Sequence, residues 1–152
     1  MIVAGVDIGS QTSKAVVLKG DNIYRSALFP TGTDLYAVAR KVVENAAQEL
    51  GHTFDDIQRI VATGYGRVSV PFAADTMSEI TCNAVGAYHF YPDARVIVDI
   101  GGQDSKAIKL NDEGKVVNFA MNDKCAAGTG RFLEVAAETL GVSVAELAAL
   151  SR

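Results

Sequence analysis

Apolar and polar residues alternate in short blocks at the start of the chain, which predicts strands. Apolar runs at residues 2–6 and 15–18 flank a stretch rich in Gly, Ser and Thr, and the polar residues 19–22 precede a third apolar segment. This order predicts a strand, a glycine turn, a strand, a polar turn and a strand. The same order returns later, with apolar runs at 96–98 and 107–110 followed by a second polar turn.

Between these two groups of strands, the period of the apolar residues becomes that of a helix. Residues 34–50 place eight apolar side chains on one helical stripe, and Gly51 follows as a glycine that can end the helix. A short strand at 57–62, a Gly-rich loop at 63–67 and a second helix at 78–90 are expected next.

The last thirty residues predict a loop followed by two helices. Residues 122–129 combine polar residues with the small residues 126–128, and residues 129–140 have helical periodicity with Gly141 as the stop. Ser143 and Glu146 match a capping box, which predicts the start of the last helix.

The two groups of strands carry one repeated motif. Residues 6–15 read VDIGSQTSKA and residues 98–107 read VDIGGQDSKA, so that eight of ten positions are identical at a constant offset of 92 residues. Chance is a poor explanation for identical Asp, Gly, Gln, Ser and Lys residues in one register. We therefore predict an α/β duplication in which residues 1–93 form a complete first lobe, and residues 94–152 begin a second lobe without finishing it.

Composition limits the class of protein. The 152 residues are 49% hydrophobic and 21% charged with a formal net charge of −4, which is typical of a soluble globular domain. No apolar run reaches the length of about 18 to 20 residues that spans a bilayer, and no basic run suggests nucleic acid as a partner. The N-terminus lacks the pattern of a signal peptide, so we expect no membrane association and a cytoplasmic location. Cys82 and Cys125 make no disulfide framework.

The repeated motif has the chemistry of a phosphate-binding turn. Glycines allow a tight turn that approaches a ligand closely, and successive backbone N–H groups form an anion nest. Hydroxyl groups add neutral donors at Ser10, Thr12, Ser13 and Ser105. Neither copy matches the Walker or the Rossmann glycine pattern. The simpler alternative is an ordinary β-turn with a solvated lysine, which two copies at a constant offset make less attractive.

Charged residues complete each copy of the motif. Lys14 and Lys106 offer positive charge to a phosphate if they point inward. Asp7 and Asp99 end the first strand of each copy, where a carboxylate can hold Mg²⁺ through water or orient an attacking water. Two such hairpins facing each other would grip the β- and γ-phosphates of ATP from opposite sides.

Five stretches of the chain carry a family resemblance. VDIGSQTSK at 6–14, TGYGR at 63–67, SEIT at 78–81, DIGGQDSK at 99–106 and NDKCAAGTGRFLE at 122–134 occur in this order. Together they resemble the activators of 2-hydroxyacyl-CoA dehydratases and the ATPase subunits of benzoyl-CoA reductase, within the acetate and sugar kinase, Hsp70 and actin superfamily. The resemblance implies a ribonuclease-H-like, actin/Hsp70-type duplicated fold.

The resemblance also implies an activity and partners. Proteins of this family are homodimeric ATPases that hold one [4Fe–4S] cluster in the dimer interface with two cysteines from each subunit. ATP drives a low-potential electron from that cluster onto a dehydratase or reductase, with ferredoxin or flavodoxin as the electron donor. ATP, Mg²⁺ and the cluster are therefore the expected cofactors.

Site residues follow by matching the motifs position by position. The first phosphate loop comprises Asp7, Gly9, Ser10, Thr12, Ser13 and Lys14, and the second comprises Asp99, Gly101, Gly102, Gln103, Asp104 and Lys106. Asp7 and Asp99 are the catalytic candidates, and Cys125 corresponds to the first cluster ligand. Locally, Cys125 precedes a helix and lies near Lys124 and Arg131, which favours a thiolate or a cluster.

The chain departs from the family pattern in three respects. The second cluster cysteine and the C-terminal Gly-rich segment that holds adenosine do not occur within it, and Asn83 stands where a histidine is expected. We therefore expect this chain to bind nucleotide weakly and to assemble no stable cluster. The alternatives are a small-molecule kinase of the same superfamily, against which the cysteine before the last helices argues, and a non-catalytic dimerisation module.

Overall fold

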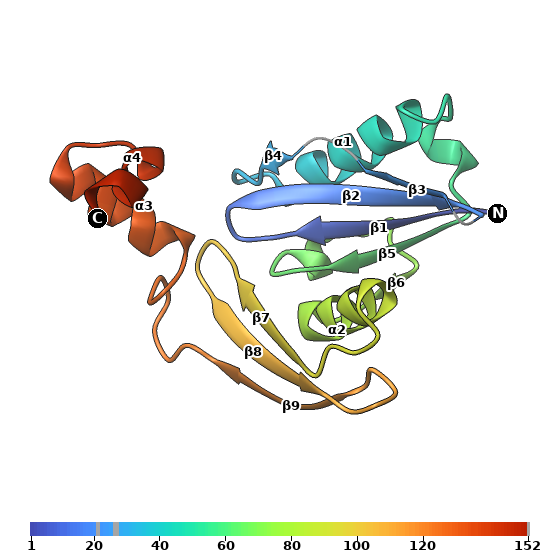
Figure 1. Cartoon of the computed structure of the whole chain (residues 1–152). Coiled ribbons are helices and arrows are strands. Elements are labelled where there is room, and N and C mark those ends of the chain that lie inside the picture. The colour runs from blue at the N-terminus through green and yellow to red at the C-terminus, as the bar shows by residue number, and fades with distance from the viewer. Residues whose placement is uncertain (21, 26–27, 152) are drawn as a thin grey trace. The chain divides into compact units, whose positions relative to one another are not determined.

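The structure is a computed structural model that describes residues 1–20, 22–25 and 28–151. The chain divides into two compact units, Met1–Cys82 and Asn83–Arg152, and the division falls within helix α2 (Glu79–Phe90). Both units combine strands and helices, as the predicted α/β class requires (Figure 1). The lobe boundary predicted after residue 93 stays a prediction, because the division into compact units does not show where the duplication begins.

The first unit is built on a mixed sheet with the strand order β3-β2-β1-β5-β6, to which β4 adds by pairing with β2. β1 runs antiparallel to β2 and parallel to β5. The strands are β1 (Ile2–Ile8), β2 (Thr12–Lys19), β3 (Asn22–Arg25), β4 (Phe29–Pro30), β5 (Arg59–Thr63) and β6 (Asp75–Thr76). β1 and β2 extend further into the repeated motif than the sequence predicted, so that only residues 9–11 form the turn.

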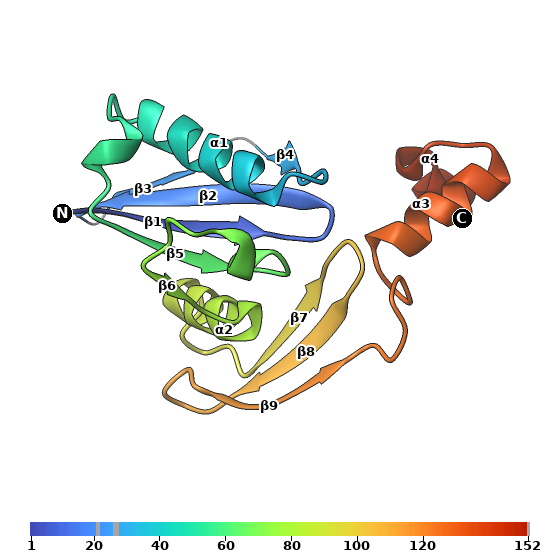
Figure 2. The ribbon, with the colours of Figure 1, turned by 180° about the vertical axis from the view of Figure 1, so that it is seen from behind.

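Helix α1 (Leu35–Gln48) covers one face of this sheet, as Figures 1 and 2 show from opposite sides. Asp34 caps the helix by accepting a hydrogen bond from the backbone N–H of Ala37 over 2.9 Å, which satisfies one of the free donors of the first turn. The predicted helical stripe is confirmed, since its central residues are buried. The core comprises Ala4, Val6, Ile8, Ala15, Val17, Val38, Ala39, Val42, Val43, Ala46, Ile60, Ala62 and Val70.

The second unit contains an antiparallel sheet with the order β7-β8-β9. The strands are β7 (Val96–Ile100), β8 (Ser105–Leu110) and β9 (Val116–Met121). Asp99 pairs with Lys106 across β7 and β8, as Asp7 pairs with Lys14 across β1 and β2. The predicted repeat of 92 residues is therefore also a repeat of strand register.

Helices α3 (Gly130–Leu140) and α4 (Val144–Leu150) end the chain. Gly141 ends α3 in the left-handed conformation with φ = 69°, as predicted. The predicted capping box is also present. In it the backbone N–H of Ser143 donates to Glu146 Oε2, and the hydroxyl of Ser143 donates to the same oxygen. These two hydrogen bonds hold the pKa of Glu146 below its usual range. Among the described residues, no helix is both long and apolar enough to cross a bilayer.

One face of the second sheet differs from its counterpart in the first unit. Val6 is fully buried beneath α1, whereas Val98, its counterpart in the repeat, is 69% exposed. Ala4 and Ile8 differ from Val96 and Ile100 in the same way. In Figures 1 and 2, α3 and α4 lie beyond the hairpin end of the second sheet and not over this face. The identical motifs are thus packed in different surroundings.

Replacing Val6 and Val98 by alanine in separate variants would measure how much the difference in burial contributes to stability. Val6→Ala is expected to destabilise the first unit by about 2 kcal/mol, because it removes two buried methyl groups and leaves a cavity. Val98→Ala is expected to change stability by less than about 0.5 kcal/mol. Native-state hydrogen exchange at β1 and at β7 provides the measurement, since it reports on each unit separately. An equal loss of stability from both replacements would mean that Val98 is buried in solution.

Candidate functional site

The first hairpin turns tightly between β1 and β2. The N–H of Gly9 donates to the carbonyl of Thr12 over 3.0 Å, and a Cβ at Gly9 would lie 2.8 Å from that same oxygen. Glycine is therefore required here by the close approach of the backbone to itself. At the base of the turn, Lys14 Nζ lies 2.6 Å from Asp7 Oδ2, and both side chains are partly exposed.

The second hairpin repeats this geometry. The N–H of Gly101 donates to the carbonyl of Asp104 over 2.8 Å, and a Cβ at Gly101 would lie 3.0 Å from it. Lys106 Nζ lies 3.7 Å from Asp99 Oδ2, but Lys106 is only 6% exposed. Asn83 donates from Nδ2 to the same Asp99 oxygen over 3.1 Å, so the unexpected asparagine of α2 contacts the predicted catalytic carboxylate.

The predicted phosphate-loop residues form two sets in the structure, one in each hairpin. In the first hairpin, Gly9 and Ser10 lie in the turn and Thr12, Ser13 and Lys14 lie at the start of β2. In the second, Gly101, Gly102, Gln103 and Asp104 form the turn and Lys106 lies on β8.

Ser13 differs from the other predicted donors, because it is fully buried. Its Oγ lies 2.8 Å from Thr31 Oγ1, which in turn donates its only hydrogen to the carbonyl of Gly9. Ser13 must therefore be the donor to Thr31. The hydroxyl of Ser13 supports the hairpin from behind, and the half-buried Ser10 and Thr12 remain as its side-chain hydroxyl donors.

Thr31 was missed by the sequence analysis. It is 5% exposed, its hydroxyl holds the carbonyl of Gly9, and its N–H donates to the carbonyl of Gln11 over 2.9 Å. One residue thus fixes both ends of the first turn. Only its position between Pro30 and Gly32, at the start of a short polar segment, could have drawn attention to it.

The predicted Gly-rich loop at 63–67 packs against the end of β1. The N–H of Gly66 donates to the carbonyl of Ile8 over 2.8 Å, and Arg67 Nη1 donates to the carbonyl of Gly64. Thr63 pairs with Asp7 in the parallel register of β1 and β5. Its Oγ1 is buried without a hydrogen-bond partner in the described part of the chain, which marks a place beside Asp7 where an additional polar group would be accommodated.

Cys125 is exposed in the loop of residues 122–129, here called the Cys125 loop. The loop and the start of α3 are bonded to the second hairpin: Ala126 N–H donates to Gln103 O over 2.8 Å, and Gly130 N–H donates to Gly101 O over 3.0 Å. Arg131 N–H likewise donates to the carbonyl of Gly102 over 2.9 Å.

These bonds correct one inference from the sequence. The first N–H groups of α3 were expected to favour an anion at Cys125, but the structure directs those of Gly130 and Arg131 to hairpin carbonyls. The guanidinium of Arg131 pairs with Glu134 at 2.8 Å. The loop itself is unusual, since Ala126 has a positive φ of 69°, a conformation that costs an L-residue roughly 1–2 kcal/mol. Its bond to Gln103 is part of what holds it there.

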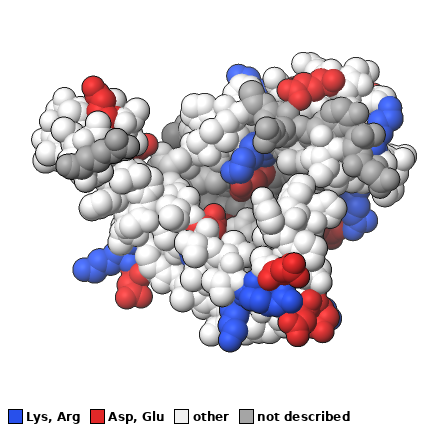
Figure 3. Space-filling view, in the orientation of Figure 1, with Lys and Arg blue, Asp and Glu red and all other residues white. Residues whose placement is uncertain are grey.

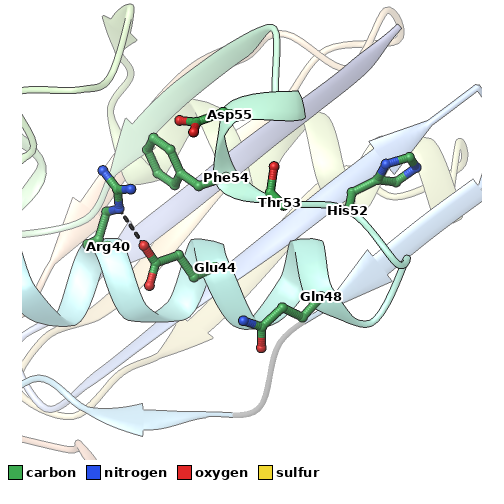
Figure 4. A pocket seen from close by; sticks show the side chains of 7 residues that line it. All are labelled: Arg40, Glu44, Gln48, His52, Thr53, Phe54 and Asp55. Atoms are coloured by element: carbon green, nitrogen blue, oxygen red, sulfur yellow. Dashed lines mark hydrogen bonds and ion pairs between the residues drawn. The ribbon is translucent and has the colours of Figure 1, made fainter.

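A pocket of about 350 Å³ lies elsewhere in the first unit, between α1 and the segment that follows it (Figure 4). Two of its charged groups pair with each other, since Arg40 Nε lies 2.6 Å from Glu44 Oε1, and the same guanidinium stacks 3.7 Å above the ring of Phe54. None of the predicted site residues line it. The lining residues are Arg40, Glu44, Gln48, His52, Thr53, Phe54 and Asp55.

Comparison with known proteins identifies the family of these hairpins. The model of the BadF/BadG/BcrA/BcrD ATPase family matches residues 4–152. The chain belongs to this family. It is 45% identical over 152 residues to the 2-hydroxyisocaproyl-CoA dehydratase activator of Clostridioides difficile. It is 48% identical over 151 residues to the activator of lactoyl-CoA dehydratase of Anaerotignum propionicum.

These relatives are longer proteins. Each match covers 99% of this chain but only 57% and 58% of the respective relative. Among solved structures, the activator of the 2-hydroxyisocaproyl-CoA dehydratase from Clostridium difficile with bound ADPNP matches with a TM-score of 0.87 and 45% identity, over 99% of this chain and 56% of that one. The fold class predicted from the resemblance, an actin/Hsp70-type α/β fold, is confirmed.

Proposed function

We propose that this member of the BadF/BadG/BcrA/BcrD ATPase family is the nucleotide-binding part of an ATP-hydrolysing activator. The activator would deliver low-potential electrons to a 2-hydroxyacyl-CoA dehydratase or a benzoyl-CoA reductase type of enzyme. The observation that carries this proposal is the pair of hairpins with the same glycine turn and the same Asp–Lys register. The names of the relatives, which are dehydratase activators, support the activator over a small-molecule kinase.

Each hairpin would bind phosphate oxygens through its turn. In the second hairpin, the carbonyls of Gly101, Gly102 and Gln103 are all bonded on one side. The planar peptide unit directs the next N–H groups, those of residues 102–104, to the opposite side. Consecutive N–H groups with this orientation form an anion nest. The half-buried Ser10 and Thr12 add donors to the first hairpin.

Asp7 and Asp99 fit a role in holding Mg²⁺. Magnesium in nucleotide sites keeps several waters and is bound through one or two carboxylates together with substrate phosphates. The unpartnered Thr63 Oγ1 beside Asp7 would accept a hydrogen bond from such a water. Bound Mg²⁺ would neutralise the charge that develops on the phosphates. Lys14 and Lys106 hold the two carboxylates in position from the neighbouring strand.

Cys125 would contribute one thiolate to a [4Fe–4S] cluster, for which its exposure and the small residues around it are suitable. Among the described residues, no group of three or more His, Cys, Asp and Glu side chains could hold a metal ion. A [4Fe–4S] cluster takes four thiolates, so the other ligands would come from outside these residues. A homodimer, an electron donor of the ferredoxin or flavodoxin kind and a cytoplasmic location belong to the same proposal.

The face of the molecule in Figure 3 is consistent with a partner that is not nucleic acid. Basic side chains of the described residues on this face are interspersed with acidic ones, and the formal net charge of the chain is −4. Binding of a polyanion such as nucleic acid depends mainly on clustered positive charge.

Calorimetry with ADP and Mg²⁺ tests the nucleotide site. The chain is expected to bind weakly, and Gly9→Ala is expected to weaken binding at least about tenfold, because the new Cβ forces the turn open. Gly5→Ala on β1 is the matched control, since a Cβ there meets nothing within 4 Å. Circular dichroism establishes that both variants fold. Unchanged binding by Gly9→Ala would contradict a site at the first hairpin.

A further inference from the structure

Asn122 lies where the second hairpin and the Cys125 loop meet. Its Oδ1 accepts a hydrogen bond from Ser105 N–H over 3.0 Å, and its own N–H donates to the carbonyl of Ser105 over 3.1 Å. Its Nδ2 donates to the carbonyls of Lys124 and Ala127, at 2.6 and 3.3 Å, and approaches Gln103 O at 3.4 Å. One side chain therefore contacts the backbone of the hairpin and of the loop together.

Only a carboxamide satisfies this arrangement. An asparagine amide has two N–H donors and an oxygen acceptor, and Asn122 uses the acceptor for β8 and the donors for the loop. An aspartate would keep the acceptor and lose both donors. An alanine would lose all of them and leave the polar backbone groups of a half-buried site to find other partners.

The two hairpins are supported in different ways from behind. In the first, Thr31 holds the carbonyls of Gly9 and Gln11. In the second, the equivalent carbonyls of Gly101 and Gln103 are held by the N–H groups of Gly130 and Ala126. The Cys125 loop and the start of α3 thus take the place that a single buried threonine occupies in the first unit.

Each peptide unit whose carbonyl is held in the second hairpin has its carbonyl on one side of the turn and its N–H on the other. Its carbonyl is bonded to the Cys125 loop or to α3, and the N–H of the same planar unit points to the nest. A rotation of the peptide after Gln103 would therefore alter the nest and break the bond to Ala126 in one motion. Ser105 adds a further link, because its Oγ donates to the carbonyl of Gly128 over 2.7 Å.

We propose that Asn122 is a positioning residue that couples the anion nest of the second hairpin to the conformation of the Cys125 loop. The proposal rests on the proposed function, in which the nest binds phosphate. In this role Asn122 does not contact the nucleotide. Its side chain keeps the Cys125 loop bonded to the second hairpin, so that a phosphate bound in the nest changes the conformation of the loop around Cys125.

The test measures the alkylation rate of the Cys125 thiol in a Cys82→Ala background, where Cys125 is the one remaining cysteine. Rates are measured without nucleotide and with saturating ADP and Mg²⁺, with binding followed separately by calorimetry. Nucleotide is expected to change the rate about tenfold, within the range of measured couplings between sites. In Asn122→Asp and Asn122→Ala, the ratio of the two rates is expected to fall close to one.

Asn118→Ala is the matched control. Asn118 lies on β9, the strand that ends just before Asn122. It is exposed and contacts only the neighbouring N–H of Phe119 among its described hydrogen bonds. This variant is expected to keep the wild-type ratio. A merely structural role of Asn122 would lower thermal stability but leave the ratio unchanged in protein that still binds nucleotide, and that result would overturn the coupling. A ratio of one in the wild type with nucleotide bound would also overturn it.

Failure of the proposed function gives a different result. If the wild type binds no nucleotide by calorimetry, the function proposed above is wrong. The measurements made without nucleotide then test whether Asn122 holds the Cys125 loop. Asn122→Ala is expected to raise the basal alkylation of Cys125 and the hydrogen exchange of the Ala126 and Gly130 amides at least about tenfold. If neither rises relative to Asn118→Ala, Asn122 does not hold the loop and the inference is wrong.

Discussion

Replacing Gly64 by alanine is expected to destabilise the first unit by about 3 kcal/mol and to displace the carboxylate of Asp7. Gly64 has φ = 85°, and an added Cβ would overlap Asp7 Oδ1 and lie 2.6 Å from the carbonyl of Ile8. The left-handed conformation costs a residue with a Cβ roughly 1–2 kcal/mol. The overlap adds roughly 1–3 kcal/mol, because the backbone of β1 must shift.

A second glycine separates these two contributions. Gly51 has a similar φ of 71°, but an added Cβ there meets nothing within 4 Å. Gly51→Ala should therefore show the conformational cost alone, roughly 1–2 kcal/mol. Urea unfolding of the two variants provides the comparison, and the weaker binding of ADP expected only for Gly64→Ala links the clash to Asp7. Equal stabilities would mean that the loop at 63–67 moves away from β1 without cost.

Replacing Asp99 by asparagine is expected to lower ATP turnover about 100-fold or more. Asparagine has almost the same shape, but it lacks the charge that would hold Mg²⁺ or orient water, and such a group contributes about 100- to 10,000-fold to a rate. Asp7→Asn tests the first hairpin in the same way. Phosphate release is the measurement for both variants.

The two aspartates should differ in their effect on stability. Lys106 beside Asp99 is 6% exposed, so loss of the acidic neighbour leaves a buried charge less well compensated. Lys14 beside Asp7 is 46% exposed, and water replaces the lost contact there. Asp93→Asn, at an exposed turn before β7, is the control for the change of residue type. Full turnover by Asp99→Asn would contradict a catalytic role of that carboxylate.

Local sequence signals predicted most elements of the fold. The helical stripe over residues 34–50 became α1, and Ser143 with Glu146 formed the predicted capping box. Such signals depend on a few neighbouring residues and on burial of one face, which is why they can be read from the chain alone. The two-residue strands β4 and β6 were not predicted, because their pairing partners are distant in sequence and so short a segment has no period.

The predicted site was less complete than the predicted fold. The repeat led to both hairpins and to the pairs Asp7–Lys14 and Asp99–Lys106, which the structure brings within 4 Å. It did not lead to Thr31 or to the contacts of Asn122, because these side chains reach backbone groups that are distant in sequence. The roles of the site residues in binding and catalysis remain predictions that the experiments above address.

The sequence by itself determined the duplicated motif, the glycine turns and the family, since these are set by residue types at fixed spacings. Only the tertiary structure decided how each copy is used. Val6 and Val98 are the same residue in the same register, yet Val6 is fully buried in the core beneath α1 and Val98 is exposed on its own sheet. Ser13 is buried against Thr31, whereas the second hairpin is held by the Cys125 loop. Burial and hydrogen-bond partners depend on which distant segments fold against a motif, and the motif itself does not encode them.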